Sequence, residues 1–153
     1  MIKNMPLPLR RINPKQLGEL LVERNMISQR QLIEALNLQK EKGGLVGEIL
    51  VSLGFVTEEA IAQALTAQYG FPYLPLANYE IDTDIVRIVP YNVAKQYCLI
   101  AIDKIGSNLT VAMSNPLNLQ AVDDIELLAN STVQIFISTT TDIKNAIERF
   151  YKK

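Results

Sequence analysis

An internal repeat constrains the fold of this chain more than any other feature of its sequence. The segment QLGELLVERNMISQRQLIEALNLQ (residues 16–39) aligns with LVGEILVSLGFVTEEAIAQALTAQ (residues 45–68) at an offset of 29. Seven of the 24 aligned positions are identical, whereas average composition would give roughly one or two by chance. The identical pairs are Gly18/Gly47, Glu19/Glu48, Leu21/Leu50, Val22/Val51, Ala35/Ala64, Leu36/Leu65 and Gln39/Gln68. Two similar supersecondary units, joined by KEKGG, are therefore predicted.

Each copy reads as two helices and a sharp turn. In the first copy, Asn13 and Pro14 are typical of a helix start, and Ser28 with Gln31 forms the pattern of a capping box for the second helix. In the second copy, Gly54 suits a left-handed helix end and Thr57 suits an N-cap. The sequence therefore predicts four short helices over residues 14–70.

Glycine and glutamine recur at matching positions of the two copies. Gly18 and Gly47 lie inside helical patterns, where glycine costs about 1 kcal/mol relative to alanine. Gln39 and Gln68 lie on the apolar stripe of the second helix of each copy and offer both a donor and an acceptor. Two interpretations stay open at this point: helix packing and capping, or paired subsites for a ligand with two similar halves.

The remainder of the chain alternates strands with helices. YGFPYLPLANYEI lacks a helical period and reads as an extended crossover, which we expect to allow relative motion of its two sides. Short helices are expected at residues 84–88 and 91–96, then a hairpin-like pair CLIAID and LTVAM, a helix from Asn118, a strand TVQIFIS and a last helix capped by Thr141. The predicted fold is α+β: a tandem helical repeat followed by a small sheet packed with helices. The expected divisions are a flexible segment (residues 1–13), the repeats (14–70), the crossover linker (71–82) and the α/β subdomain (83–153).

Composition argues against several functional classes. The chain has no histidine, which removes the commonest general base and the usual zinc ligand, and no glycine is followed by the Lys-Ser or Lys-Thr of a phosphate-binding loop. Its single cysteine, Cys98, lies in an apolar alternation typical of a buried thiol. A net charge of −1 and an aromatic content of 7% do not favour DNA or RNA binding. We therefore expect a cytoplasmic protein that is not an enzyme, has no metal site and does not insert into a membrane.

The tandem copies, followed by YGFPYLPL, NLTVAMSNPLNLQAVDDIELL and STTTDIKNAIERFY, resemble the N-terminal domain of type IV pilus assembly and type II secretion ATPases. The resemblance covers residues 14–151. It implies a non-catalytic domain that precedes a hexameric motor and docks it to an inner-membrane platform protein. In one branch of the family, tandem motifs bind cyclic di-GMP as a regulatory ligand.

The resemblance also implies ligand-binding positions. The family motif is a basic residue, Leu and Gly, followed by spaced apolar residues and a closing Gln. The matching positions are Leu17, Gly18, Leu32, Leu36 and Gln39, then Val46, Gly47, Ile61, Leu65 and Gln68. Where the motif opens with a basic residue, this chain has Gln16 and Leu45. Arg10 and Arg11 precede the first motif and are the candidates to supply the missing charge.

Two functions follow from the resemblance. The first is a regulatory domain with a degenerate cyclic di-GMP site. The second is a docking module without a nucleotide ligand, whose partner is an inner-membrane platform protein or a motor ATPase. In both, the protein is cytoplasmic and is recruited to the inner membrane through its partner.

Overall fold

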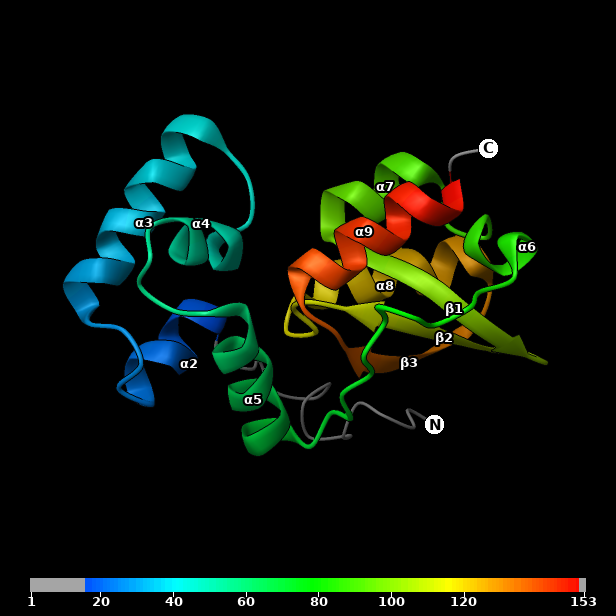
Figure 1. Ribbon diagram of the computed structural model, residues 1–153, viewed down its shortest axis with the longest axis horizontal. Helices are drawn as coiled ribbons and strands as arrows, with labels where there is room; N and C mark the ends of the chain where they lie inside the picture. The colour runs from blue at the N-terminus through cyan, green and yellow to red at the C-terminus, as the bar shows by residue number, and fades with distance from the viewer. Residues whose placement is uncertain (1–15, 152–153) are drawn as a thin grey trace.

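The computed structural model describes residues 16–151 and has two halves (Figure 1). The first half holds the four helices of the repeat, and the second holds a three-stranded sheet with its helices. The elements of the first half are α2 (Leu17–Glu23), α3 (Gln29–Lys42), α4 (Val46–Ser52) and α5 (Glu58–Tyr69). The second half comprises α6 (Thr83–Val86), α7 (Tyr91–Tyr97), β1 (Leu99–Ile105), β2 (Asn108–Met113), α8 (Leu119–Ala129), β3 (Thr132–Ile137) and α9 (Thr140–Tyr151). The predicted α+β class, with a helical repeat before a small sheet, is confirmed.

The two copies of the repeat fold alike. Helices α2 and α4 begin and end at positions related by the sequence offset, and α3 and α5 begin at related positions. The predicted caps are present: Ser28 and Gln31 form a capping box at α3, and the Thr57 hydroxyl accepts a hydrogen bond from the Ala60 amide at α5. Local sequence signals therefore determine where the second helix of each copy starts.

The turn inside each copy also repeats. Asn25 and Gly54 occupy matching positions, and both have positive φ, 62° and 80°. The next residue donates its amide hydrogen to a carbonyl five residues earlier, from Met26 to Leu21 at 2.9 Å and from Phe55 to Leu50 at 3.0 Å. This pattern is the Schellman ending of a helix. The positive φ of Gly54 confirms the left-handed helix end expected there, whereas Asn25 adopts the same conformation without a glycine, because asparagine tolerates the left-handed region.

The crossover is extended, as expected, but part of its apolar surface is buried. Phe71 and Leu76 are almost wholly enclosed. Tyr73 forms a bridge with Ile137, and the amide of Leu74 donates to the Ile137 carbonyl at 2.9 Å. The Ser138 hydroxyl donates to the Leu74 carbonyl. These contacts attach the start of the crossover to the end of β3, which argues against a free tether; the relative motion of the halves stays a prediction.

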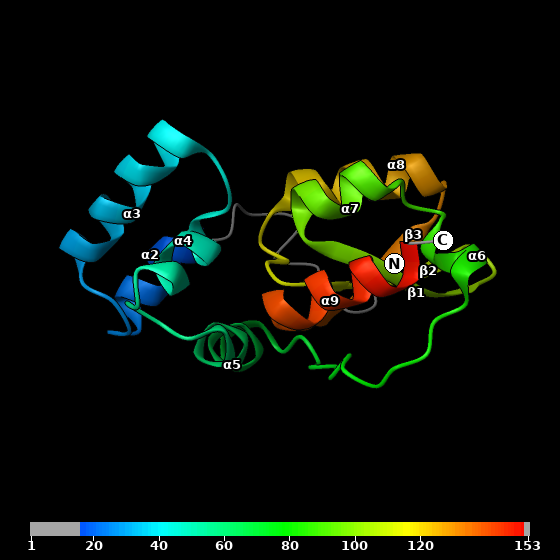
Figure 2. The ribbon, with the colours of Figure 1, turned by 45° about the horizontal axis from the view of Figure 1, so that its top comes forward.

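The sheet has the strand order β1-β2-β3. Strands β1 and β2 form an antiparallel pair, and β3 returns parallel to β2 after α8. Helices α8 and α9 lie on opposite sides of the sheet, as the two views together show (Figures 1 and 2). Helices thus cover both faces of the sheet. The buried residues are Leu109, Val111, Ala112 and Met113 of β2 and Val133, Ile135 and Ile137 of β3.

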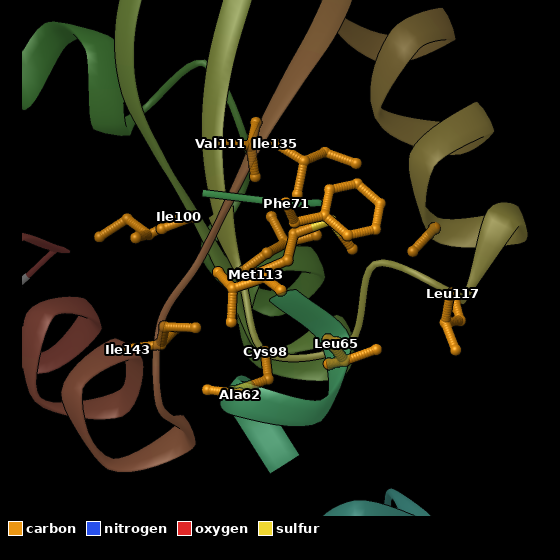
Figure 3. Close-up of a cluster of buried hydrophobic side chains, with 14 of the residues drawn as sticks. Ala62, Leu65, Phe71, Cys98, Ile100, Val111, Met113, Leu117, Ile135 and Ile143 are labelled. Atoms are coloured by element: carbon orange, nitrogen blue, oxygen red, sulfur yellow. The ribbon is translucent and has the colours of Figure 1, made fainter. Parts of the chain in front are cut away.

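Helix α5 joins the two halves through a shared apolar core. Figure 3 shows Ala62 and Leu65 of α5 gathered with Cys98, Met113 and Ile143 of the second half. All five side chains are buried, and Leu65 is 0% exposed. Burial raises the pKa of the Cys98 thiol to about 11, in agreement with an inert, packed cysteine.

One predicted cap is wrong. Thr141 does not cap the last helix; the Thr139 hydroxyl accepts the hydrogen bond from the Asp142 amide at 3.2 Å instead. Thr141 lies inside α9 and contacts the repeat half through Glu58. The run of three threonines at 139–141 offers three hydroxyls at successive positions, so the sequence alone did not distinguish the cap. The Asn13–Pro14 start falls outside the described residues.

We predict that amides of the crossover exchange with solvent faster than those of the central strand. Val111 lies in β2, which forms backbone hydrogen bonds with a neighbouring strand on each side. Within residues 71–79, the amides of Leu74 and Tyr79 donate the described backbone hydrogen bonds. Hydrogen exchange should be at least about tenfold faster at Tyr73 and Ala77 than at Val111, because opening this segment breaks fewer bonds. Uniform protection of residues 71–79 at the level of Val111 would mean that the halves do not move relative to each other.

Candidate functional site

Two neighbouring hollows border the helix starts of the repeat. The first, of about 290 Å³, is here named the repeat hollow and is lined by Gln16, Gly18, Glu19, Gln29, Leu32, Leu36 and Val46. The second, of about 560 Å³, lies between the two halves and is here named the inter-half hollow. Its lining residues are Gln16, Leu17, Gln39, Leu45, Val46, Asn115, Leu117, Asn118 and Leu119. Gln16 and Val46 line both hollows, so the two form one region around the starts of α2 and α4.

The two recurring glycines allow close helix packing. A Cβ atom at Gly18 would lie 2.4 Å from Cδ1 of Leu32, on the second helix of the same copy. A Cβ atom at Gly47 would lie 3.1 Å from Cδ2 of Leu17 and 3.8 Å from Cδ1 of Ile61. A Cβ atom would therefore overlap Leu32 at Gly18, whereas at Gly47 it would only crowd Leu17, so close packing favours glycine strongly at the first position and weakly at the second. This packing role accounts for the recurrence without a ligand.

The apolar motif residues divide into a buried set and a lining set. Leu17, Leu32 and Ile61 are buried between the helices, although Leu17 and Leu32 also reach a hollow wall. The equivalent leucines of the two copies differ: Leu36 is 39% exposed and lines the repeat hollow, whereas Leu65 is 0% exposed and belongs to the shared core. The two copies thus do not offer matching apolar walls.

The two recurring glutamines also have different surroundings. Gln39 lines the inter-half hollow, and its Nε2 donates to the Gly44 carbonyl at 2.9 Å. Gln68 is exposed near the end of α5, and its Oε1 accepts from Arg24 Nη1 at 3.5 Å. The structure therefore brings Leu17, Gly18, Leu32, Leu36, Gln39 and Val46 to the hollows; Gly47 and Ile61 pack behind them, and Leu65 and Gln68 lie elsewhere.

The electrostatics of the hollows follow from the absent basic residues. Gln16 lines both hollows and Leu45 lines the inter-half hollow, so each position where the family motif has a basic residue borders the site. Among the described lining residues, Glu19 is the charged one, and no Lys or Arg joins it. Arg10 and Arg11 lie outside the described residues. The site is apolar and amide-rich, with a weakly acidic edge.

The loop from β2 to α8 supplies a wall that our sequence analysis did not predict. Asn115, Leu117, Asn118 and Leu119 line the inter-half hollow from the second half. The Asn115 side chain accepts from the Leu117 amide at 3.1 Å, and Asn118 accepts from the Ala121 amide at 3.2 Å, which fixes the loop. Two asparagines around Pro116 were a signal of a rigid turn, but nothing in the sequence placed that turn beside the repeat.

Comparison with known proteins decides the family. The sequence model of the MshEN domain matches residues 69–153, more than half of the chain. The chain belongs to the MshEN domain family. The matched segment covers the crossover and the second half of the chain. The tandem repeat precedes it, in residues 16–68.

Individual relatives agree with this assignment. The chain is 36% identical over 136 residues to the type IV pilus assembly ATPase PilB of Myxococcus xanthus, covering 89% of this chain and 24% of the relative. It is 33% identical over 142 residues to the type IV pilus assembly ATPase PilB of Thermus thermophilus, covering 92% of this chain and 16% of the relative. The chain thus spans a quarter or less of the length of these curated relatives.

Solved structures show the same fold. The structure of MshE with cyclic di-GMP has a TM-score of 0.66 and 32% identity, covering 90% of this chain and 100% of that one. The N-terminal domain of XpsE has a TM-score of 0.69 at 21% identity, covering 88% and 93%, and shows the fold alone. The predicted resemblance to N-terminal domains of pilus and secretion ATPases is confirmed.

Residues 16–151 contain neither a candidate metal site nor a candidate membrane-spanning helix. No group of three or more Cys, Asp or Glu side chains in this range could hold a metal ion. None of the helices described there is both long and apolar enough to cross a bilayer.

We predict opposite outcomes for alanine at the two glycines. Gly18→Ala should lower the free energy of unfolding by about 1–2 kcal/mol. The added methyl group displaces buried Leu32, and the cost of this repacking exceeds the gain in helix propensity from alanine. Gly47→Ala should stay within about 1 kcal/mol of the unsubstituted chain, because Leu17 must move only slightly. Urea denaturation measures both values. Equal destabilisation would contradict the assigned difference in packing.

Proposed function

We propose that this chain is a non-catalytic regulatory domain of a type IV pilus or type II secretion ATPase and that its two hollows bind cyclic di-GMP weakly. The observation that carries the proposal is that Gln16, at the position of the motif's basic residue, lines both hollows. The likeness to MshE, whose structure contains this ligand, supports it. We place the domain in the cytoplasm, held at the inner membrane through a partner protein.

The lining suits a flat, hydrogen-bonding ligand. Leu32, Leu36 and Val46 provide apolar surface for a base in the repeat hollow. In the inter-half hollow, Gln39, Asn115 and Asn118 carry amides, which can both donate and accept hydrogen bonds. Apolar walls with a few polar groups are typical of small-molecule sites.

The same lining accounts for weak binding. A guanidinium contacts the O6 and N7 atoms of guanine with two hydrogen bonds and also offsets phosphate charge. Neither contribution is available from Gln16 or Leu45. Glu19 borders the repeat hollow, and its negative charge would repel the phosphates of the ligand. The ligand thus keeps its apolar contacts and loses its main electrostatic partners.

We predict that restoring the basic residues strengthens binding. Isothermal titration calorimetry with cyclic di-GMP should give weak or no binding for the unsubstituted chain. Each of Gln16→Arg and Leu45→Arg should raise the affinity by about 5- to 150-fold, the effect of about 1–3 kcal/mol for a two-bond arginine–guanine contact. Leu45 is half-buried, so thermal unfolding must confirm that each variant is folded.

Matched controls separate the site from a general charge effect. Gln63→Arg makes the same substitution on α5, at an exposed position that lines neither hollow, and should leave the affinity unchanged. Tight binding by the unsubstituted chain would mean that other groups supply the charge, and Arg10→Ala/Arg11→Ala tests whether they are these arginines. A folded Gln16→Arg/Leu45→Arg variant that does not bind would overturn the ligand proposal.

The second candidate is a docking module that binds a platform protein or a partner ATPase and has no nucleotide ligand. The packing of Gly18 against Leu32 and of Gly47 against Leu17 favours it, because these contacts explain the motif by stability alone. Failure of the restored variant to bind would select this function.

We also predict that the purified chain does not hydrolyse ATP. It lacks a phosphate-binding loop, and within residues 16–151 no cluster of acidic side chains could hold magnesium. A phosphate-release assay should give the background rate. Turnover that copurifies with the chain through successive columns would contradict this expectation.

A further inference from the structure

Two polar contacts link the repeat half to the last helix. Glu58, at the start of α5, accepts two hydrogen bonds from Thr141 of α9: the backbone amide donates to Oε1 at 2.9 Å and the hydroxyl donates to Oε2 at 2.7 Å. In α4, the Glu48 carboxylate accepts from Lys144 Nζ, also on α9, at 2.9 Å. These four residues are here named the polar clasp. Each of its contacts joins one half of the molecule to the other.

The polar clasp and the inter-half hollow share helix α4. Leu45, its N-cap, and Val46, its first residue, line the hollow, whereas Glu48 in the same turn contacts α9. A single helical turn is stiff, so a movement of α4 at the hollow is also a movement at Lys144. On its other side the hollow is bounded by the loop that contains Asn115 and Asn118. The width of the hollow therefore depends on the same relative position of the halves that the clasp holds.

The strengths of the contacts suit an adjustable link. The side chains of Lys144 and Glu48 are 57% and 27% exposed, and exposed ion pairs are weak. The hydrogen bond to Glu48 raises the pKa of Lys144, so the Lys144 ammonium stays protonated at neutral pH. Apart from the clasp, Ala62 and Leu65 lie in the same buried apolar cluster as Met113 and Ile143, and this cluster can serve as an apolar hinge between the halves (Figure 3).

We propose that the polar clasp sets the opening of the inter-half hollow, so that a ligand in the hollow and the position of α9 are coupled. A ligand that contacts both walls favours the closed arrangement, and loss of the clasp makes that arrangement less populated. The effect of the clasp on the opening of the hollow concerns the chain alone, whereas its coupling to a ligand rests on the proposed function.

The first experiment needs no ligand. Spin labels are attached at Lys40→Cys on α3 and Leu127→Cys on α8, both exposed, while Cys98 stays buried and unlabelled. Electron–electron double resonance then gives the distance distribution between the halves. In the Glu48→Ala/Glu58→Ala variant the distribution should broaden or shift. Glu59→Ala, the neighbouring acidic residue in the first turn of α5, is the matched control and should leave it unchanged.

The second experiment measures coupling. In the Gln16→Arg/Leu45→Arg background, adding Glu48→Ala/Glu58→Ala should weaken cyclic di-GMP binding by about two- to tenfold, because the variant loses both contacts of the clasp and each contact of this exposed kind contributes little. The clasp residues line neither hollow, so a direct contact does not explain such a loss. Adding Glu59→Ala to the same background should not change the affinity.

The outcomes separate the two parts. An unchanged distance distribution in a folded clasp variant would overturn the proposal that the clasp sets the separation of the halves. A changed distance distribution together with an unchanged affinity for cyclic di-GMP would overturn the coupling between the clasp and the ligand. If no variant binds cyclic di-GMP, the proposed function and the coupling both fail, and the distance measurement still decides whether the clasp sets the separation of the halves.

Discussion

The burial of α5 against the end of the sheet is the contact on which the arrangement of this molecule depends. Leu65 and Ala62 face Met113, Cys98 and Ile143, so the last helix of the repeat also serves as part of the core of the second half. Apolar burial contributes about 25 cal/mol per Å² of surface removed from water, whereas exposed ion pairs contribute about 0–1 kcal/mol each. Because α5 is fixed, the remaining helices of the repeat are held over the β2–α8 loop, and a hollow forms between them.

The repeat shows how one sequence pattern can serve packing and recognition together. Gly18 is required by the position of Leu32, and Leu32 also forms a wall of the repeat hollow. The residues that stabilise the copy are thus partly those that a ligand would touch. The glycine and apolar positions of the motif therefore contribute to folding in a chain that has Gln16 and Leu45 at the first motif positions, whether or not a ligand binds.

Local signals were the predictable part of this structure. Ser28, Thr57 and Asn118 cap helices as their sequence contexts indicated, and the offset between the copies gave the matching bounds of α2 and α4. The errors and omissions concern tertiary contacts. Thr141 binds Glu58 instead of capping its own helix, and that partner is 83 residues away. Likewise, nothing local distinguishes Leu36 from Leu65, since their exposure depends on whether the sheet lies beside the helix. The site positions carried over from the family stay predictions as ligand contacts.

The unequal surroundings of Leu36 and Leu65 have a consequence for stoichiometry and symmetry. The sequence repeat suggests a pseudo-twofold site, but one copy faces a hollow while its counterpart is sealed inside the molecule. A ligand composed of two identical halves would therefore meet two unlike environments. Its equivalent atoms would become inequivalent in the complex, and their magnetic resonance signals would split into two sets of equal intensity at a ratio of one ligand per chain. The two similar sequence copies thus have unlike surroundings in the folded chain.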